Sequence, residues 1–310
     1  MKQYKYIKQS TGQLNEPEKS WGGQWTNQKL DAFEKYVNAY LTIMNVYRYK
    51  YNWKLIYFDG FAGSGSRQEV VEDDSMGQTL FGKDINQEDT QVYRGAAERV
   101  LSISQTGFDY YYFIDIDAKA NEELEKRLNG SKNYNKCVFR NGDANDQVRR
   151  LCQAMKDNSN LRALVLLDPF GMDVNWQSLE LFKGLSVDLW ILIPTGVIVN
   201  RLLDKKCKLK HIDKLKSFFG MEEAEIKDRF YKIDSPFEVL FEDQVHVKKI
   251  EKPILEISKL YVEKLKGMFK SVVDEPLVLY NSKSCPIYHF AFASNNETAR
   301  RIAKDIIGKS

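Results

Sequence analysis

Short apolar runs recur along the chain, and most of them end in an acid or a turn-forming residue. Each run is rich in β-branched and aromatic residues and is followed by a polar segment with helical spacing. A continuous apolar run is typical of a strand buried on both faces of a sheet, and alternation with helices predicts parallel strands. The sequence therefore predicts an α/β fold. The five runs span residues 54–59, 110–117, 136–140, 162–167 and 187–194.

Further segments frame this series. Residues 25–49 carry apolar side chains at a three-to-four spacing, which predicts an amphipathic helix lying on the sheet. Residues 275–280 and 286–293 predict an antiparallel hairpin that closes a seven-stranded sheet. We therefore divide the chain into a lead-in with a helix (1–50), a core (51–204), a helical insertion (205–274) and a closing hairpin with a last helix (275–310).

The first run leads straight into a glycine-rich turn, Asp59-Gly60-Phe61-Ala62-Gly63-Ser64-Gly65. Glycine permits positive φ and lets a ligand lie against bare backbone, and ligands of open α/β sheets bind outside the carboxyl ends of the strands. The turn lacks the Gly-Lys-Ser/Thr of a P-loop and begins with a carboxylate, so it suits a cationic ligand better than a phosphate. A turn without a ligand is the alternative.

The pattern Asp-x-Phe-x-Gly-x-Gly resembles the first motif of Rossmann-like S-adenosylmethionine-dependent methyltransferases. The resemblance implies that the turn holds the methionine part of the cofactor, which carries an ammonium and a sulfonium group. It assigns cofactor contacts to Asp59, Gly60, Phe61, Gly63 and Gly65. The acidic stretch 66–93 that follows is long for a loop, which is typical of a functional or a disordered segment.

The ends of the second and third runs add two further cofactor contacts. An acid at the end of the second strand can accept hydrogen bonds from both ribose hydroxyls. We assign this role to Asp117, or to Asp115 if the strand ends two residues earlier. In methyltransferases an acid after the third strand accepts from the adenine amino group and the next N–H donates to the ring, which fits Asp143 and Ala144. Capping of the following helices is the alternative for these acids.

The fourth run ends in Asp168-Pro169-Phe170-Gly171 and resembles the Asp/Asn-Pro-Pro-Tyr/Phe motif of amino-methyltransferases. The resemblance implies that the acid accepts hydrogen bonds from an amino group and that the aromatic ring stacks on the base. Asp168, Pro169 and Phe170 are therefore the predicted catalytic residues, although Phe170 replaces the second proline of the motif. Methyl transfer is a direct displacement, so alignment and hydrogen bonding supply most of the catalysis. An Asp-Pro turn without a catalytic role is the alternative.

Charge and composition narrow the class of protein further. The 310 residues carry a net charge of +3, which is too small to indicate nucleic-acid binding by itself. Residues 201–216 nevertheless hold seven Lys or Arg against two Asp. This stretch predicts either phosphate contacts, through Lys205, Lys206, Lys208 and Lys210, or a solvated helical face.

Metal and membrane sites are not predicted. The three histidines and four cysteines stand apart from one another, so no metal-ligand spacing and no disulfide framework is present. The first residues lack the apolar core of a signal peptide, and no apolar stretch is long enough to span a bilayer. We therefore expect a cytoplasmic protein.

A closer resemblance covers residues 25–305 and joins the motifs above with several tryptophans and a terminal Phe-Ala-Phe-Ala-Ser. The chain resembles the three-Cys-motif partner proteins (TcmP), which are methyltransferase-like. This resemblance implies a partner of the radical-S-adenosylmethionine type that carries three cysteines. The residues that carry it are Trp25, Lys29, Leu30, residues 57–65, residues 142–145, residues 167–171, Trp176, residues 188–194, Arg201 and residues 290–294.

Two hypotheses from different classes follow. The first is an enzyme that methylates an amino nitrogen of a nucleobase in RNA or DNA; a small-molecule or protein amine is a further possible acceptor class. The second is a cofactor-binding adaptor for the three-cysteine protein, without activity of its own. The retention of acids at four strand ends favours the enzyme, because an adaptor has little need of the acid after the fourth strand.

Overall fold

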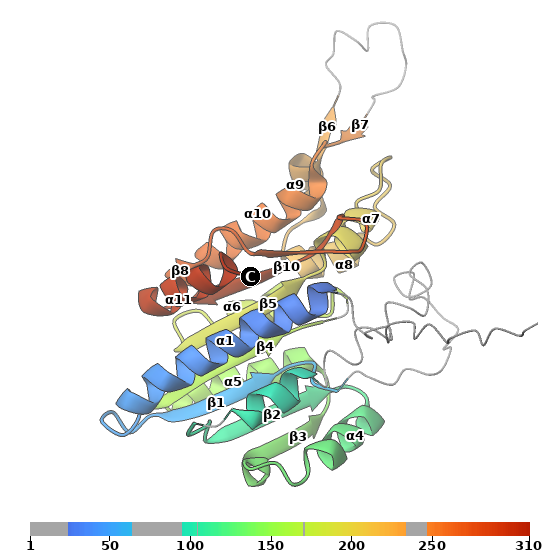
Figure 1. Cartoon of the computed structure of the whole chain (residues 1–310). Coiled ribbons are helices and arrows are strands. Elements are labelled where there is room, and N and C mark those ends of the chain that lie inside the picture. Colours follow the sequence, from blue (N-terminus) through green and yellow to red (C-terminus); the bar gives the residue numbers. More distant parts are fainter. Residues whose placement is uncertain (1–23, 64–94, 104, 170, 234–246) are drawn as a thin grey trace, which may run out of the picture.

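The computed structural model describes residues 24–63, 95–103, 105–169, 171–233 and 247–310 (Figure 1). Its centre is a sheet of eight strands in the order β3-β2-β1-β4-β5-β10-β8, with β9 also paired to β10. These strands are β1 (Lys54–Asp59), β2 (Tyr110–Asp115), β3 (Cys137–Asn141), β4 (Leu161–Leu167), β5 (Val187–Ile193), β8 (Ser271–Val272), β9 (Leu277–Tyr280) and β10 (Pro286–Ser294). A separate two-stranded ribbon consists of β6 (Tyr231–Ile233) and β7 (Val247–Lys249).

The helices connect and cover these strands. The longest is α1 (Gln24–Tyr47), and a further helix spans residues 95–102. The others are α4 (Ala118–Leu128), α5 (Ala144–Asp157), α6 (Trp176–Glu180), α7 (Asn200–Leu202), α8 (Ile212–Phe219), α9 (Glu223–Phe230), α10 (Pro253–Lys266) and α11 (Glu297–Ile307). A 3-10 turn, η1 (Tyr134–Lys136), precedes β3, and a π-helical turn, η2 (Thr195–Val199), follows β5.

The sheet has the predicted mixture of directions. Strands β1 to β5 run parallel, and their order reverses between β1 and β4. Strand β10 runs antiparallel to β5 and pairs on its other side with β8 at residues 293–294 and with β9 at residues 286–290. The two short strands are therefore parts of one interrupted edge strand. This arrangement confirms the predicted Rossmann-like α/β fold of five parallel strands closed by antiparallel C-terminal strands.

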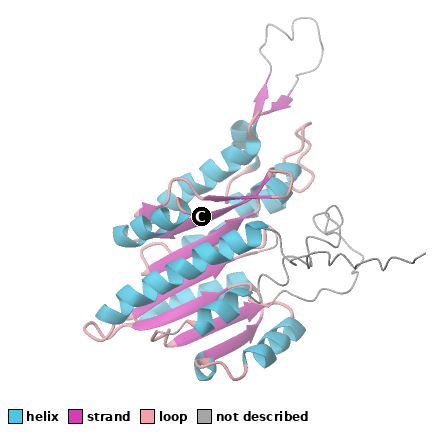
Figure 2. Ribbon diagram, viewed as in Figure 1, coloured by secondary structure: helices cyan, strands magenta, loops and turns pink. Residues whose placement is uncertain are grey.

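Helices cover both faces of the sheet (Figure 2). Alternate residues of β1 belong to opposite cores: Leu55 and Tyr57 belong to the core that α1 and α11 line, whereas Ile56 and Phe58 belong to the core that α5, α6 and α10 line. Both faces of the central strands are thus buried, which is why their sequences are continuous apolar runs. The core under α1 is aromatic, and the indole of Trp190 lies at its centre, in contact with rings of α1 and β10.

A buried and a partly buried ion pair hold the two ends of α1 to the sheet. Near the start of the helix, Lys29 Nζ lies 2.6 Å from Asp168 Oδ2. Just beyond its end, Arg48 forms an ion pair with Asp109. Asp168 follows the carboxyl end of β4, whereas Asp109 precedes the amino end of β2. The helix is therefore fixed at opposite edges of the sheet.

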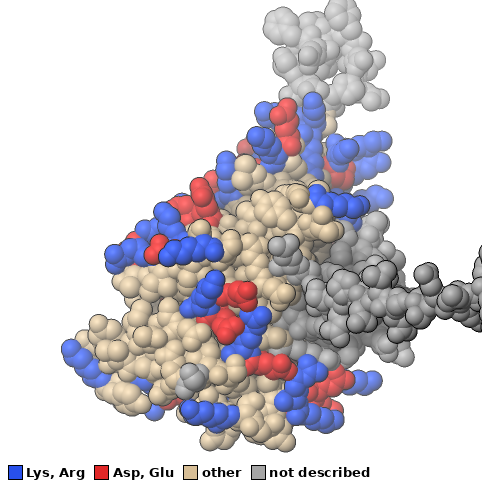
Figure 3. Space-filling model, in the orientation of Figure 1, with Lys and Arg blue, Asp and Glu red and all other residues tan. Residues whose placement is uncertain are grey.

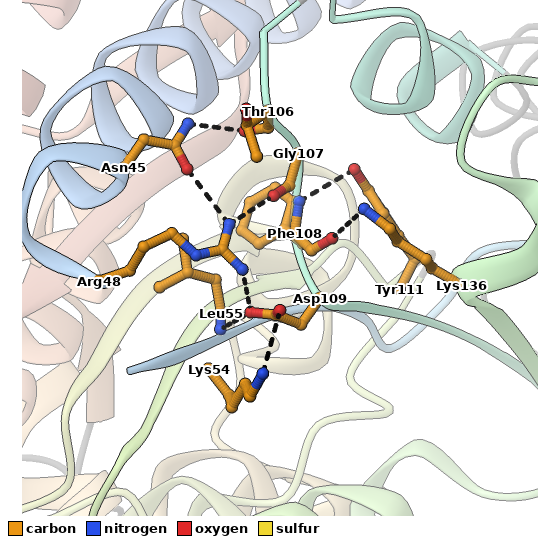
Figure 4. Close-up of polar contacts among 10 residues, drawn as sticks. All are labelled: Asn45, Arg48, Lys54, Leu55, Thr106, Gly107, Phe108, Asp109, Tyr111 and Lys136. Carbon is orange, nitrogen blue, oxygen red and sulfur yellow. Dashed lines mark hydrogen bonds and ion pairs between the residues drawn. The ribbon is translucent and has the colours of Figure 1, made fainter. Parts of the chain in front are cut away.

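The pair at the amino edge belongs to a larger network (Figure 4). The Arg48 guanidinium also donates to the carbonyl oxygen of Gly107 at 2.9 Å and to Asn45 Oδ1 at 3.2 Å. Asp109 Oδ2 accepts from the backbone N–H of Leu55 at 2.7 Å. The network joins α1, the start of β1 and the loop before β2, so it sets the position of the helix over the strands.

Several predicted elements have different limits. Strand β2 ends at Asp115, two residues before the end of its apolar run. The sequence also predicts a helix over residues 174–184, where the structure has the short α6. It predicts another helix over residues 213–232, where the structure has two helices, because Gly220 ends α8 with a φ of +58°. A side chain at Gly220 would also meet the indole of Trp176 at 2.3 Å, so the bend is fixed by packing.

Three further observations concern the described residues alone. Within these ranges no helix has the length and apolar character that a membrane span requires. The four cysteines are free thiols. No group of three or more His, Cys, Asp or Glu side chains is placed to hold a metal ion in the described part of the chain.

Replacing Arg48 with Met should lower the free energy of unfolding by about 3–5 kcal/mol, because the carboxylate of Asp109 loses its buried partner. Urea denaturation monitored by circular dichroism measures this loss. The matched control is Arg149→Met, which breaks an ion pair with Asp146 in which both side chains are more than 60% exposed. The control should lose less than about 1 kcal/mol. Equal losses would show that the network does not anchor α1.

Candidate functional site

The reversal of strand order brings three acids together at the carboxyl edge of the sheet. Asp59 ends β1, Asp115 ends β2, and Asp168 directly follows β4. Their exposed fractions are 0%, 4% and 1%. The point where strand order reverses is where open α/β sheets bind ligands. The site residues predicted on the first, second and fourth strands therefore share one location in the fold.

The glycine turn crosses from β1 towards β2. The N–H of Ala62 donates to the carbonyl oxygen of Ile114 at 2.7 Å, and the N–H of Gly63 donates to Asp115 Oδ2 at 3.1 Å. A Cβ on Gly63 would lie 3.1 Å from the backbone of Ala120 in α4. Glycine is required there because the helix approaches the turn so closely. Gly65 lies outside the described residues, as does the whole acidic stretch 66–93.

Asp59 lies in the floor of this turn. Its Oδ1 accepts from the N–H of Phe61 at 3.2 Å, and its Oδ2 accepts from the hydroxyl of Tyr57 at 3.1 Å. The pKa of the Asp59 carboxyl is raised from 3.8 to about 7, mainly by burial and also by the nearby carboxylates of Asp168 and Asp115, while these two hydrogen bonds lower it. A cation bound beside Asp59 would offset both the burial and the neighbouring negative charge that raise this pKa.

Asp168 accepts from a lysine that the sequence analysis did not assign to the site. Its Oδ2 accepts the 2.6 Å hydrogen bond from Lys29, and its Oδ1 is buried and has no hydrogen-bond partner among the described residues. Trp25, one helical turn before Lys29, places its ring 5.5 Å from the ammonium. Pro169 is buried next to Asp168. Phe170 lies outside the described residues, so its predicted stacking role stays a prediction.

The two acids at the end of β2 have different surroundings. Asp115 is the residue at the strand end, and it supports the turn: besides the N–H of Gly63, its carboxylate accepts from the N–H of Asp117 at 2.7 Å. Asp117 is partly exposed and caps α4 by accepting from the N–H of Lys119 at 2.9 Å. Asp115 therefore has a structural task as well, and the ribose contact stays a prediction for both acids.

The residues after β3 fix the neighbouring loop. Asp143 Oδ1 accepts from the N–H of Asn145 at 2.7 Å and so caps α5, which starts at Ala144. The side chain of Asn145 then bridges to the loop after β4, donating to the carbonyl oxygen of Asp173 and accepting from the N–H of Asn175. The capping alternative for Asp143 is thus present, and the predicted adenine contact of Asp143 and Ala144 stays untested.

The four predicted phosphate-binding lysines lie on a loop rather than on a helix. The alternative of a solvated helical face is therefore wrong about the helix only, and phosphate contact stays a prediction. Between α7 and α8, the carboxylate of Asp204 accepts from the backbone N–H groups of residues 206, 208 and 209 at 2.8, 3.2 and 2.7 Å. These bonds engage backbone N–H groups that a helix would need for its own hydrogen bonds, so they favour a loop. The loop carries four exposed side chains, Lys205, Lys206, Lys208 and Lys210.

This loop reaches the same edge of the sheet as the acids. It follows the carboxyl end of β5 through η2 and α7 (Figure 1). Lys and Arg side chains gather on the part of the surface that carries α7, α9 and the β6–β7 ribbon (Figure 3). The predicted substrate-binding lysines and the predicted catalytic acid therefore belong to one end of the strands.

Two polar features of this edge were missed by the sequence analysis. Lys29 falls on the buried face of α1, four residues after Trp25 and four before Phe33, so a lysine inside an apolar stripe was the available signal. His289 Nδ1 lies 2.8 Å from Thr195 Oγ1 at the end of β5. Burial lowers the pKa of His289 to about 4, so the imidazole is neutral. No sequence pattern connects His289 with Thr195, because the two residues are 94 positions apart in the chain.

The raised pKa of Asp59 predicts a particular dependence of stability on pH. The folded protein holds this proton up to about pH 7, whereas the unfolded chain loses it near 3.8, so folding becomes less favourable as pH rises between these values. Asp59→Asn removes this penalty. Its free energy of unfolding relative to the wild type should increase by roughly 2–4 kcal/mol between pH 4 and pH 8.

Thermal and urea unfolding at several pH values measure this difference. The control is Asp305→Asn, because Asp305 is exposed on α11. Its difference from the wild type should change little with pH. A pH-independent difference for Asp59→Asn would contradict the buried, destabilised carboxyl.

No family model and no curated protein matches the chain. Among solved structures, it is similar to a crystal structure of protein LPL1258 from Legionella pneumophila, assigned to the family DUF519. The two chains share 12% sequence identity and a TM-score of 0.37, over 88% of this chain and 97% of the other. A similarity of this extent carries no conclusion about function.

Proposed function

We propose that this protein transfers a methyl group from S-adenosylmethionine to an amino nitrogen of a nucleobase in RNA or DNA. The observation that carries the proposal is the set of three buried carboxylates at the reversal of strand order. Of the described lysines and arginines, only Lys29 and Arg48 are buried, and Arg48 lies at the opposite edge. The site therefore has an excess of buried negative charge, which suits a ligand with a positive charge.

The residues present fit this cofactor. Asp59, with the turn residues Gly60, Phe61 and Gly63, would hold its cationic methionine part, because a positive charge would stabilise the buried carboxylate of Asp59. The acids after β2 and the start of α5 are the candidates for its ribose and adenine. When bound, the cofactor supplies a methyl group that passes from sulfur to a neutral nitrogen, and the nitrogen then releases a proton to water.

Asp168 supports the choice of an amino acceptor. Its buried Oδ1 is an acceptor without a partner among the described residues, and an unsatisfied buried acceptor is costly unless a ligand supplies a donor. If the amino group that receives the methyl donates an N–H to this oxygen, its nitrogen lone pair would point towards the methyl group. A base within a duplex would first have to be flipped out of the stack.

The lysine loop supports a nucleic acid as the carrier of that amino group. Lys205, Lys206, Lys208 and Lys210 project from a loop that Asp204 holds in a fixed shape at the same edge as Asp168. Lysines held in this way can contact the phosphates of a strand whose base enters the site.

The second candidate is an adaptor that binds the cofactor and acts only with a three-cysteine protein of the radical-S-adenosylmethionine type. The resemblance to the three-Cys-motif partner proteins favours it. Buried Asp168 argues for the enzyme, because cofactor binding alone does not require an unpaired acceptor at this position.

Incorporation of labelled methyl into separate tRNA, rRNA, DNA and protein fractions tests the proposal. The wild-type protein should label one nucleic-acid fraction, and Asp168→Ala should reduce this labelling by more than about 100-fold, because the acceptor is no longer oriented. Cofactor affinity, measured by calorimetry, should stay within a few-fold. Cofactor binding without any labelling would favour the adaptor, and lost cofactor binding in Asp168→Ala would place that acid in the cofactor site.

Neutralising three lysines of the loop tests the nucleic-acid contact. The variant Lys205→Gln, Lys206→Gln, Lys208→Gln should bind the labelled RNA or DNA about 10-fold or more weakly at 100 mM salt, and its salt dependence should be less steep. Fluorescence anisotropy at several salt concentrations measures both changes. The control replaces Lys183 and Lys304, which are exposed elsewhere on the protein. Equal behaviour of the two variants would exclude the loop as a phosphate contact.

A further inference from the structure

The proposed function leaves the ion pair between Lys29 and Asp168 unexplained. The residues are 139 positions apart in the sequence, and each side chain is only 2% exposed. A lysine ammonium is strongly hydrated, and a buried ion pair is often less stable than apolar residues of the same volume. Stability alone is therefore a weak reason for a lysine at this position of α1.

The two oxygens of Asp168 have different surroundings. Lys29 Nζ occupies Oδ2 at 2.6 Å, while buried Oδ1 has no partner among the described residues. The ammonium therefore fixes the orientation of the carboxylate and leaves one oxygen for a donor from outside. The ring of Trp25, 5.5 Å from the ammonium, and the fixed start of α1 hold the lysine in turn.

We propose that Lys29 is a positioning residue that presents Asp168 as a one-oxygen acceptor and thereby selects a neutral amino group. This inference rests on the proposed function. An amino group that donates a hydrogen bond to Oδ1 lies one carboxylate width from the Lys29 ammonium on Oδ2. With the cationic cofactor bound beside the other two acids, an alkylammonium, such as a lysine side chain at neutral pH, would meet the like charge of Lys29 in a site of low dielectric. The exocyclic amine of a nucleobase is neutral and meets no such repulsion.

The test compares Lys29→Met with Arg48→Met. Both variants break an ion pair that ties α1 to the sheet and in which the basic side chain is buried, so both should lower the melting temperature. Turnover on the labelled nucleic acid should fall more than about 100-fold in Lys29→Met and stay within about 3-fold of the wild type in Arg48→Met. Lys29→Arg, which keeps the charge, should recover part of the loss.

Cofactor binding separates positioning from general damage. Lys29→Met removes a positive charge near a site for a cation, so S-adenosylmethionine should bind with equal or higher affinity by calorimetry. A damaged site would bind it more weakly while turnover also falls. Unchanged turnover in Lys29→Met, or equal losses of turnover in the two variants, would overturn the inference while leaving the proposed function intact.

A measurement on the unaltered protein covers the case in which Lys29→Met does not fold. Methyl transfer to unmodified tRNA, rRNA and DNA is compared with transfer to poly-L-lysine at pH 7, where its side chains are charged. Transfer to a nucleic acid alone supports the inference, and transfer to poly-L-lysine at a similar rate overturns it. If the protein transfers methyl to none of them, the proposed function fails and the inference fails with it.

Discussion

The contact between Lys29 and Asp168 connects the main parts of this protein. It joins the first described helix to the carboxyl end of β4, and it supplies a buried cation at the edge that carries three buried acids. Charges are costly to bury without a partner, so the position of α1 and the charge balance around Asp168 depend on each other. The ion pair between Arg48 and Asp109 anchors the other end of α1, and the aromatic core between the two pairs covers one face of the sheet.

Burying three carboxylates at one site is unfavourable for folding, and a cationic ligand would offset this unfavourable free energy. Among the described residues, three buried carboxylates share one edge with a single buried ammonium, and burial together with the other carboxylates raises the pKa of Asp59 to about 7. In the protein alone this charge opposes folding above neutral pH. A bound cation would offset it, so ligand binding and stability should be linked. Such an arrangement is typical of a binding site, where stability is given up for affinity.

The nucleic-acid proposal depends on where the loops lie. The carboxyl ends of parallel strands meet at one edge, so the segments after β1, β4 and β5 converge there. Asp168 and the lysine loop are on two of these segments. The backbone bonds to Asp204 give the loop a defined shape, which lowers the entropy lost when its lysines bind phosphates. A strand held by the loop would therefore approach the end of β4 that carries the acid.

The sequence by itself determined the class of fold and the strand ends at which the acids of the candidate site lie. Apolar runs, glycines and acids at strand ends are local features, so strands β1 to β5, the closing C-terminal strands and the location of Asp59 and Asp168 followed from them. Only the tertiary structure decided which side chains meet across long separations. It paired Lys29 with Asp168 and placed the carboxylate of Asp115 as the acceptor for the N–H of Gly63 in the glycine turn. It also folded the basic stretch into a loop around Asp204. The physical reason is that burial and long-range partners, which no local pattern encodes, fix the charge and the hydrogen bonds of a side chain.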